Sequence, residues 1–136
     1  MEVLIEHLGE VQFGVKARQH FIACDQPVEN GGYDEGMTPP ELFLASLGSC
    51  AAYYAAQYLR KKKLATAGTF VRVSAGKATD PPRLEDFKIE LILPVDVSEE
   101  DRAGVLDSVR HCLIHNTLLH PPRMSVELKT SAVLSG

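Results

Sequence analysis

The sequence lacks tryptophan, has only three cysteines and carries no excess of positive charge. It contains 14 lysines and arginines but 18 aspartates and glutamates, which gives a formal net charge of −4. A chain of this charge has no general attraction for phosphate backbones, so we expect no nucleic-acid partner. Residues 1–10 have too short an apolar run, and too many acids, for a secretory signal. We therefore expect a cytoplasmic protein whose thiols stay reduced, and in which any disulfide is transient.

The rest of the composition is that of a folded protein. Hydrophobic residues make up 45% and charged residues 24% of the 136 positions, which is typical of a globular chain. No internal repeat, low-complexity segment or domain boundary is visible, so we expect one domain over residues 1–136. The sequence also has no phosphate-binding glycine loop, serine nucleophile elbow or HExxH motif.

The most informative stretch covers residues 38–63. It opens with a helix-start signature, in which Thr38 is the expected N-cap and Glu41 its capping-box partner. It closes with four consecutive cations, which are favourable at the carboxyl end of a helix. No formally charged side chain lies between Leu42 and Leu59. A helix that is apolar all round is either buried or inserted in a membrane. The capping box and the polar residues within the run favour a buried core helix, with Cys50 near its middle.

Alternating apolar residues predict strands on both sides of this helix. Before it we expect strands near residues 3–5, 11–15 and 21–24, followed by a surface loop over residues 26–37. After it, residues 70–75 and 87–93 form a hairpin around a turn at 80–83, and residues 124–129 form a last strand. This order of elements indicates an α+β fold: strands, a long helix, two strands, a helix and a strand.

A second helix is expected after Ser98, which is followed by acids that are typical of a helix start. Val105, Leu106, Val109, Cys112 and Leu113 then recur at three- and four-residue spacings. This spacing predicts one continuous helix whose buried stripe includes Cys112.

Two runs resemble the cysteine motifs of the OsmC/Ohr family. The run GGYDEGMTPPELFLASLGSC, residues 31–50, is similar to the first-cysteine motif, and HCLIHNTL, residues 111–118, is similar to the second. The DQP at residues 25–27 fits one branch of the family, and the resemblance extends from about Arg18 to Glu127. It implies the OsmC-like fold, with antiparallel sheets packed around a long central helix. It also implies an intertwined homodimer with two active sites at the subunit interface.

The activity that the resemblance implies is cysteine-dependent reduction of organic hydroperoxides, with no cofactor. By position, Cys50 would be the peroxidatic thiol and Cys112 the resolving one. A thiolate attacks the O–O bond and becomes a sulfenic acid, which over-oxidises unless a second thiol condenses with it. An external dithiol, of the lipoyl type in family members, would then reduce the disulfide.

Family members also place an arginine and a glutamate beside the reactive thiol. Their glutamate lies ten residues before the cysteine, where this chain has Pro40. Glu41 lies nine residues before Cys50, which puts the two about 180° apart around a straight helix. Glu41 is therefore a candidate for catalysis or simply the capping-box partner of Thr38. Arg18 is the candidate arginine, or else a solvated strand residue.

Other interpretations stay open. Buried cysteines are often inert small hydrophobes, and Cys24 is expected to be one. A dimer that binds an apolar small molecule without catalysis, or a redox sensor, would fit the same motifs. His111, Cys112 and His115 are close in sequence, but the first two would point about 100° apart on a helix, and no second ligand pair has a recognisable spacing. We therefore expect no metal site.

Overall fold

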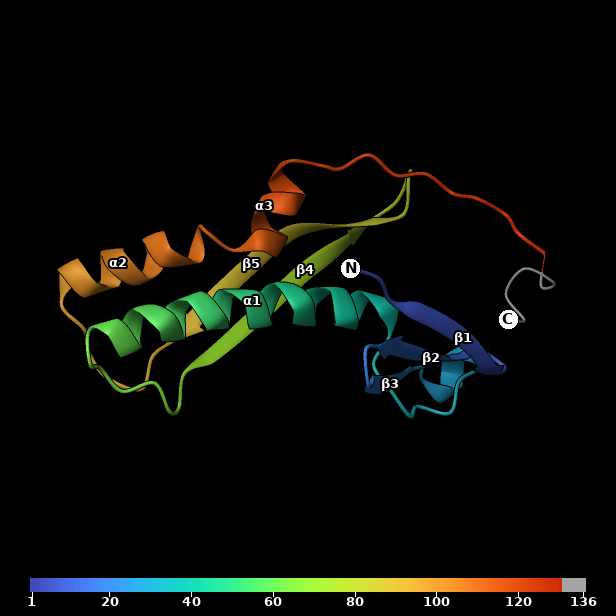
Figure 1. Cartoon of the computed structure of the whole chain (residues 1–136), viewed down its shortest axis with the longest axis horizontal. Helices are drawn as coiled ribbons and strands as arrows, with labels where there is room; N and C mark the ends of the chain where they lie inside the picture. Colours follow the sequence, from blue (N-terminus) through green and yellow to red (C-terminus); the bar gives the residue numbers. More distant parts are fainter. Residues whose placement is uncertain (131–136) are drawn as a thin grey trace.

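The long helix α1, Pro39–Lys61, runs through the middle of the molecule (Figure 1). The structure is a computed structural model, and it describes residues 1–130. The predicted capping box is confirmed: Thr38 Oγ1 accepts a hydrogen bond from the Glu41 N–H, and the Glu41 carboxylate accepts one from the Thr38 N–H. Within the described residues, no helix is both long and apolar enough to cross a membrane.

The N-terminal sheet contains three antiparallel strands in chain order. They are β1 (Leu4–Gly9), β2 (Gln12–Ala17) and β3 (His20–Cys24). Short turns join them, and the three strands confirm what the alternation of apolar residues predicted. A short 3-10 helix, η1 (Val28–Asn30), lies in the loop that leads to α1. Over the described residues, this sheet makes no substantial contact with α1, the second sheet or the later helices.

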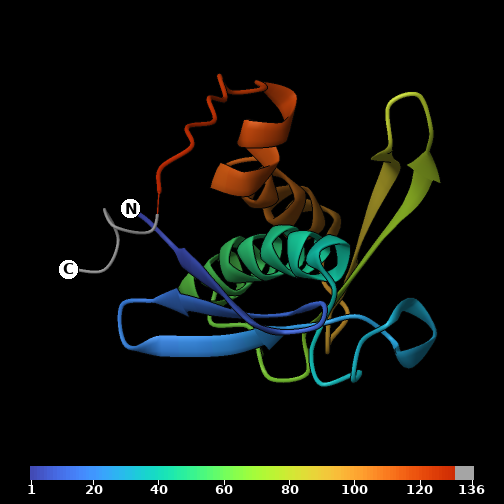
Figure 2. The same ribbon diagram turned by 90° about the vertical axis from the view of Figure 1, so that its right-hand side faces the viewer.

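The second sheet is the predicted hairpin, built from β4 (Phe70–Ala78) and β5 (Arg83–Ile92). Its outer end leans away from the body of the molecule (Figure 2). Val71 and Val73 lie on the more buried face of β4, whereas Phe70 and Arg72 are exposed. The more buried face contacts α1, and Gly48 of α1 allows the close approach because a Cβ there would meet Val73.

The predicted second helix is two helices. Helix α2 covers Glu99–Val109 after the N-cap Ser98, and α3 covers Leu113–Leu119. The prediction of one continuous helix was wrong because Cys112 has a non-helical backbone, with φ −59° and ψ 123°, and serves as the N-cap of α3. Leu106 and Leu113 are exposed, so the predicted stripe is not a single buried face. Cys112 is nevertheless fully buried.

The last predicted strand is not formed in the described chain. Residues 121–130 belong to no helix or strand, although the apolar residues alternate as expected. Met124, Val126 and Leu128 are 87%, 93% and 98% exposed. A strand needs a hydrogen-bonding neighbour, and none of the described strands of this chain lies in register beside this segment.

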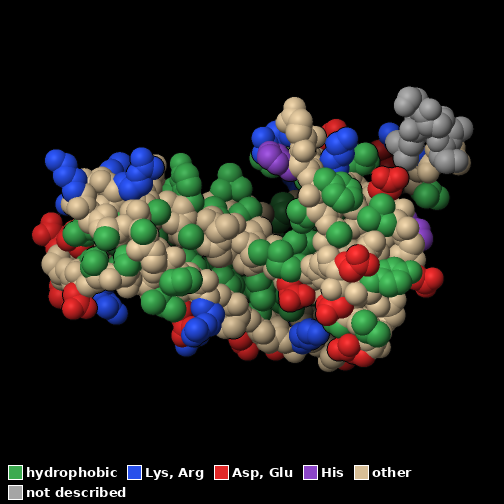
Figure 3. Space-filling view, turned by 90° about the horizontal axis from the view of Figure 1, so that it is seen from below, with side chains coloured by type: hydrophobic (Ala, Val, Ile, Leu, Met, Phe, Trp, Pro, Cys, Tyr) green, Lys and Arg blue, Asp and Glu red, His purple; other side chains and the backbone are tan. Residues whose placement is uncertain are grey.

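Only one face of α1 is covered by the chain itself. Its buried residues join two from α2 in one hydrophobic cluster: Ala51, Ala55, Leu59, Val105 and Val109. On other faces of α1, Phe43 and Tyr53 remain exposed. From below, hydrophobic side chains are visible across the middle of the molecule (Figure 3). A single chain therefore does not bury this helix on all sides.

Candidate functional site

Cys50 lies near the middle of α1 and is half-buried. The next residue, Ala51, is fully buried, and so is Leu47, one turn earlier. Cys50 therefore lies at the edge of the buried face of α1, where its side chain is partly accessible to solvent. It is a free thiol, as are Cys24 and Cys112.

Cys112 lies at the junction between α2 and α3 and has no exposed surface. As the N-cap of α3, it points its thiol at the first turn of that helix. The backbone N–H of His115 donates a hydrogen bond to Cys112 Sγ, with an N–S distance of 3.5 Å. The break between the two helices therefore has a structural consequence, because it turns Cys112 toward α1.

The structure brings these two predicted site residues together, since the Cys50 thiol is near enough to Cys112 to shift its pKa. Burial raises the pKa of Cys112, and the nearby Cys50 thiol raises it further, while the N–H groups of His115 and Ile114 act in the opposite direction. Cys112 is therefore a protonated thiol at neutral pH. Two adjacent free thiols, one half-buried and one buried, can form a disulfide between α1 and α3 when one of them is oxidised.

An apolar pocket opens along α1, toward its N-terminus from Cys50. It has a volume of about 330 Å³ and is lined by Pro39, Pro40, Phe43, Leu84, Phe87 and Leu118. The rings of Phe43 and Phe87 lie with their centroids 6.0 Å apart. Phe43 precedes Cys50 by seven residues, which is about two helical turns, so the two lie on the same side of α1. The pocket can therefore accept an apolar group on the same side of α1 as Cys50, about 10 Å along the helix from it, and neither cysteine lines the pocket.

Glu41 is not placed beside Cys50 of the same chain. Its carboxylate accepts hydrogen bonds from the N–H and the hydroxyl of Thr38, at 3.0 and 2.8 Å. These bonds lower the pKa of Glu41. Glu41 also lines a groove between α1 and β4 that includes Gly48 and Val73. The geometry thus shows Glu41 as a helix cap on another face of α1.

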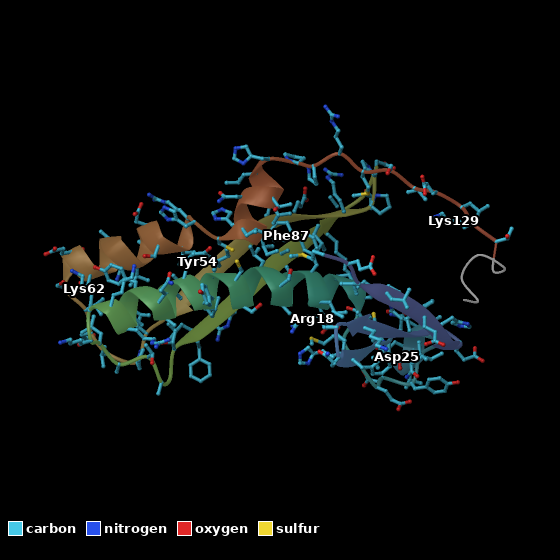
Figure 4. The ribbon with its side chains drawn as sticks, in the orientation of Figure 1. Arg18, Asp25, Tyr54, Lys62, Phe87 and Lys129 are labelled. Carbon is cyan, nitrogen blue, oxygen red and sulfur yellow. The ribbon has the colours of Figure 1, made fainter. Side chains whose placement is uncertain are left out.

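Arg18 is also separate from the cysteines of its own chain. It occupies the turn between β2 and β3, is exposed and has a left-handed φ of 55°. In Figure 4 it lies below α1, whereas Tyr54 and Phe87 lie above. Among the described residues, Arg18 forms no ion pair.

Asp25 is a structural residue whose role sequence analysis missed. It is a fully buried carboxylate that accepts hydrogen bonds from the N–H groups of Gln26, Tyr33 and Glu35 and from the side chain of Gln12. Burial acts to raise the pKa of Asp25, but these bonds together lower it. Asp25 thereby holds the glycine-rich loop before α1. The DQP run was the only sequence signal for this role.

The loop also needs its glycines for close packing. A Cβ at Gly32 would overlap the carbonyl of Gln26, and a Cβ at Gly36 would overlap the carbonyl of Ala23. The run that resembles a cysteine motif therefore contains structural residues as well as the thiol.

No group of three or more metal-ligating side chains occurs among residues 1–130. The Nδ1 atoms of His111 and His120 both bond to backbone carbonyls, those of Asp107 and Asn116 respectively. Since a carbonyl only accepts hydrogen bonds, these nitrogens carry protons.

Comparison with known proteins agrees with this architecture. The sequence profile of the OsmC-like protein family matches residues 32–127. A search of curated proteins found no significant match. The chain is similar in structure to a protein from Psychrobacter arcticus named for osmotic stress induction and a detoxification response, with TM-score 0.76, 22% identity and 85% of each chain covered.

Two further solved structures are similar. An OsmC-like protein from Mycoplasma pneumoniae has TM-score 0.75 and 19% identity, with 88% of this chain and 87% of that chain covered. An organic hydroperoxide resistance protein from Elizabethkingia anophelis has TM-score 0.60 and 19% identity, with 86% and 87% covered. At these identities the structures show the fold alone: α+β, with antiparallel sheets and a long helix.

Proposed function

The chain belongs to the OsmC-like protein family, and from that premise we propose that it is a thiol peroxidase that reduces organic hydroperoxides through Cys50 and Cys112. The observation that carries this proposal is the proximity of the two thiols, one on α1 and the other at the N-cap of α3. A more accessible thiol beside a buried one suits a peroxidatic and a resolving cysteine. A similar structure is named for organic hydroperoxide resistance, which adds support.

The proposed reaction has three steps. The Cys50 thiolate attacks one oxygen of the hydroperoxide, which breaks the O–O bond and gives the Cys50 sulfenic acid and an alcohol. The Cys112 thiol then attacks the sulfenic sulfur, so a disulfide forms and water leaves. An external dithiol, of the lipoyl type that the family resemblance implies, reduces the disulfide and returns both thiols. The oxidant is the peroxide and the reductant is the dithiol.

The proposed preference for organic over inorganic peroxide rests on the pocket of about 330 Å³ along α1. Its lining is made of prolines, phenylalanines and leucines. Burial of apolar surface contributes about 25 cal/mol per Å², so an alkyl or aryl group that enters this pocket strengthens binding in a way that hydrogen peroxide cannot.

We propose that the working form is a homodimer. One face of α1, the N-terminal sheet and the segment 124–128 all present apolar side chains that the chain itself does not cover. Contiguous apolar surface of this kind marks a protein interface. In such a dimer, Arg18 and Glu41 would serve as activating groups for the cysteine site of the other subunit rather than of their own. The proposed setting is the cytoplasm, in a response to oxidative stress, where reductant keeps both thiols ready.

The test is intact mass and thiol count after one equivalent of cumene hydroperoxide, on the wild type and on Cys112→Ser. We expect a Cys50–Cys112 disulfide in the wild type, and sulfenic or sulfinic Cys50 in the variant. Repeated turnover with a dithiol would distinguish an enzyme from a redox sensor, which oxidises once and stops. Retention of every thiol in both proteins would contradict the proposal.

The second candidate function is binding of an apolar small molecule without catalysis. It is favoured by the hydrogen bonds that tie Glu41 to Thr38, which leave the thiol of the same chain without a carboxylate partner among the described residues. The two functions separate in the same experiment, because the binding protein would show no peroxide-dependent disulfide.

A further inference from the structure

A second pocket, which we call the polar pocket, borders α3 on a different face from the apolar pocket of about 330 Å³. It has a volume of about 560 Å³ and is lined by Tyr54, His111, Leu113, Asn116, Thr117, His120 and Pro122. The apolar pocket takes only Leu118 from α3 and has no polar side chain in its lining. The two pockets therefore suit ligands of different chemistry.

The polar pocket lies beside both thiols. Tyr54 follows Cys50 by four residues on α1, so their Cβ atoms are about 5–6 Å apart on one side of the helix. His111 and Leu113 are the residues directly before and after Cys112. Neither cysteine lines the pocket, so a molecule bound in it reaches Cys50 through a chain of about four C–C bonds, each of about 1.5 Å. The pocket is thus placed to hold the tail of a molecule whose reactive end is at the thiols.

The two pockets approach Cys50 from opposite directions along α1. Phe43, in the apolar pocket, precedes Cys50 by seven residues, whereas Tyr54 follows it. Figure 4 shows the same order, with Phe87 nearer the N-terminus of α1 than Tyr54. The proposed reaction uses two substrates in succession, an organic peroxide and then a dithiol. The apolar pocket suits the first, which leaves the polar pocket for the second.

The hydrogen bonds around the polar pocket define what it can bind. His111 and His120 donate from Nδ1 to backbone carbonyls, so Nε2 of each neutral ring is an acceptor. Thr117 donates its hydroxyl proton to a backbone carbonyl, which leaves its oxygen as a further acceptor. The donors among the lining side chains are the Tyr54 hydroxyl and the Asn116 amide. A ligand amide, which has both N–H donors and a carbonyl acceptor, therefore matches this lining better than a carboxylate does.

We infer that the polar pocket binds the tail of the reducing dithiol, and that Asn116 and Tyr54 select a tail that carries an amide group. This inference rests on the proposed function. The tail lies in the polar pocket, and the dithiol end extends along α1 to the disulfide. Cys50 is the sulfur that is attacked, because Cys112 is fully buried and Cys50 only half-buried.

The reduction balances without a further reactant. One thiolate of the dithiol attacks Cys50 Sγ, so a mixed disulfide forms and the Cys50–Cys112 bond breaks. Cys112 leaves as a thiolate and takes up the proton that the attacking thiol released. The second thiol of the dithiol then attacks the dithiol sulfur of the mixed disulfide, which closes a cyclic disulfide and releases Cys50. The dithiol loses two electrons and the protein disulfide gains them.

The experiment follows reduction of the disulfide in a single turnover at pH 8. Wild type, Asn116→Asp and Asn116→Lys are oxidised, freed of oxidant and mixed with dihydrolipoamide or dihydrolipoate, which differ only in an amide or a carboxylate on the tail. Thiols are counted by mass after quenching. We expect the wild type to react faster with the amide. Asn116→Asp should raise the amide-to-carboxylate rate ratio about tenfold and Asn116→Lys should lower it about tenfold, because the new charge repels or attracts the carboxylate.

Asn30→Asp and Asn30→Lys are the matched controls, because Asn30 is an exposed asparagine of η1 outside both pockets. They change the net charge of the protein equally and should leave the rate ratio unchanged. Dithiothreitol, a dithiol without a tail, should reduce every variant at the wild-type rate. Tyr54→Phe tests the pocket independently of Asn116. It removes one hydroxyl donor and should slow the reaction with dihydrolipoamide about 3–10-fold, but not the reaction with dithiothreitol.

Two ways of forming the disulfide separate this inference from the proposed function. One sample is oxidised with cumene hydroperoxide and another with diamide, which oxidises thiol pairs without a peroxide. If only diamide forms the disulfide, and its reduction depends on Asn116 as expected, the peroxidase proposal fails and the dithiol site stands. The inference is overturned by a faster wild-type reaction with the carboxylate, by a ratio that the Asn116 variants leave unchanged or the Asn30 variants change equally, or by an equal loss with dithiothreitol.

Discussion

The N-terminal sheet and the region that follows Thr38 use hydrophobic residues in opposite ways. After Thr38, residues of α1 and α2 form a cluster in which every member is 8% exposed or less. In the sheet, four large apolar residues remain 47–65% exposed: Leu4, Ile5, Phe21 and Ile22. One part of the chain therefore has a core of its own, and the other presents its apolar side chains outward.

The N-terminal sheet is stabilised by hydrogen bonds. Its strands form an antiparallel ladder with one register shift between His7 and Gly9, and the loop that follows is organised by the buried carboxylate of Asp25. A three-stranded sheet that leaves its apolar residues exposed gains little from the hydrophobic effect. The difference between the two regions means that the sheet keeps its shape through hydrogen bonds, while its apolar residues are available to a second copy of the chain.

The largest effect is expected from Leu59→Ala, which leaves a cavity in the cluster between α1 and α2. Leu59 is fully buried, and such a truncation costs about 2–5 kcal/mol. Because this core lies within one chain, the loss should be independent of protein concentration. Urea unfolding at several concentrations measures it.

Ile22→Ala is the matched change in the sheet. If a second copy of the chain covers Ile22, the loss of stability caused by Ile22→Ala should grow with protein concentration. The reason is that the dimer, and not the single chain, gains from burial of this side chain. An equal cost at every concentration would mean that both regions are stabilised within one chain, and would remove the contrast between them.

Much of this fold was accessible from sequence, and the exceptions have physical causes. The capping box at Thr38 and the two hairpins depend on neighbouring residues, so local patterns predicted them. The break before Cys112 was missed because apolar spacing continues across it, although the backbone does not. The segment 124–129 alternates as a strand should, but strand pairing needs a neighbour that spacing cannot supply.

The candidate site, too, was predicted only in part from the sequence. The motifs identified Cys50 and Cys112, and the structure places them near each other, although their roles stay a prediction. The role of Asp25 was missed because its partners, among them Gln12 and Glu35, converge only when the loop folds. The polar pocket is likewise a property of packing, and no spacing in the sequence indicates it.

A smaller but still large loss of stability is expected from Asp25→Asn, which alters the carboxylate that organises the loop before α1. Asp25 Oδ2 accepts bonds from Gln12, Tyr33 and Glu35 while Oδ1 accepts one from Gln26. An amide presents its NH₂ to donors on one side or the other, so hydrogen bonds are lost in either orientation. The unfolding midpoint should fall by on the order of 10 °C. Gln12→Ala, which removes one donor, should lower it less.

The same carboxylate predicts a pH dependence. The pKa of Asp25 is lowered in the folded state: burial opposes the shift, but the four hydrogen bonds outweigh it. Its stabilisation is therefore present above the unfolded pKa of about 3.9 and is lost as pH falls through the folded value. The gap in unfolding midpoint between wild type and Asp25→Asn should narrow below about pH 4. A gap that stays constant down to pH 2 would mean that the charge of Asp25 contributes nothing.

The smallest effect is expected at the junction of the two regions, where the capping box starts α1. Glu41→Gln and Thr38→Ala each remove part of one reciprocal set of hydrogen bonds. Both should lower the unfolding midpoint by about 2–4 °C, the usual consequence of losing a helix cap in a chain of this size. Thermal unfolding at pH 7 measures this, and Ser46→Ala, an exposed change later in α1, is the control.

Comparison of the variants Glu41→Gln and Thr38→Ala also tests whether Glu41 activates a thiol. If Glu41 only caps the helix, both variants should form the Cys50 sulfenic acid at nearly the wild-type rate, because Cys50 lies well along α1 from the cap. If Glu41 activates a thiol, in its own chain or across a dimer, Glu41→Gln should slow peroxide consumption at least tenfold, whereas Thr38→Ala should not. Since the two changes disturb the same cap, a difference in rate between them cannot come from helix stability and must come from the carboxylate itself.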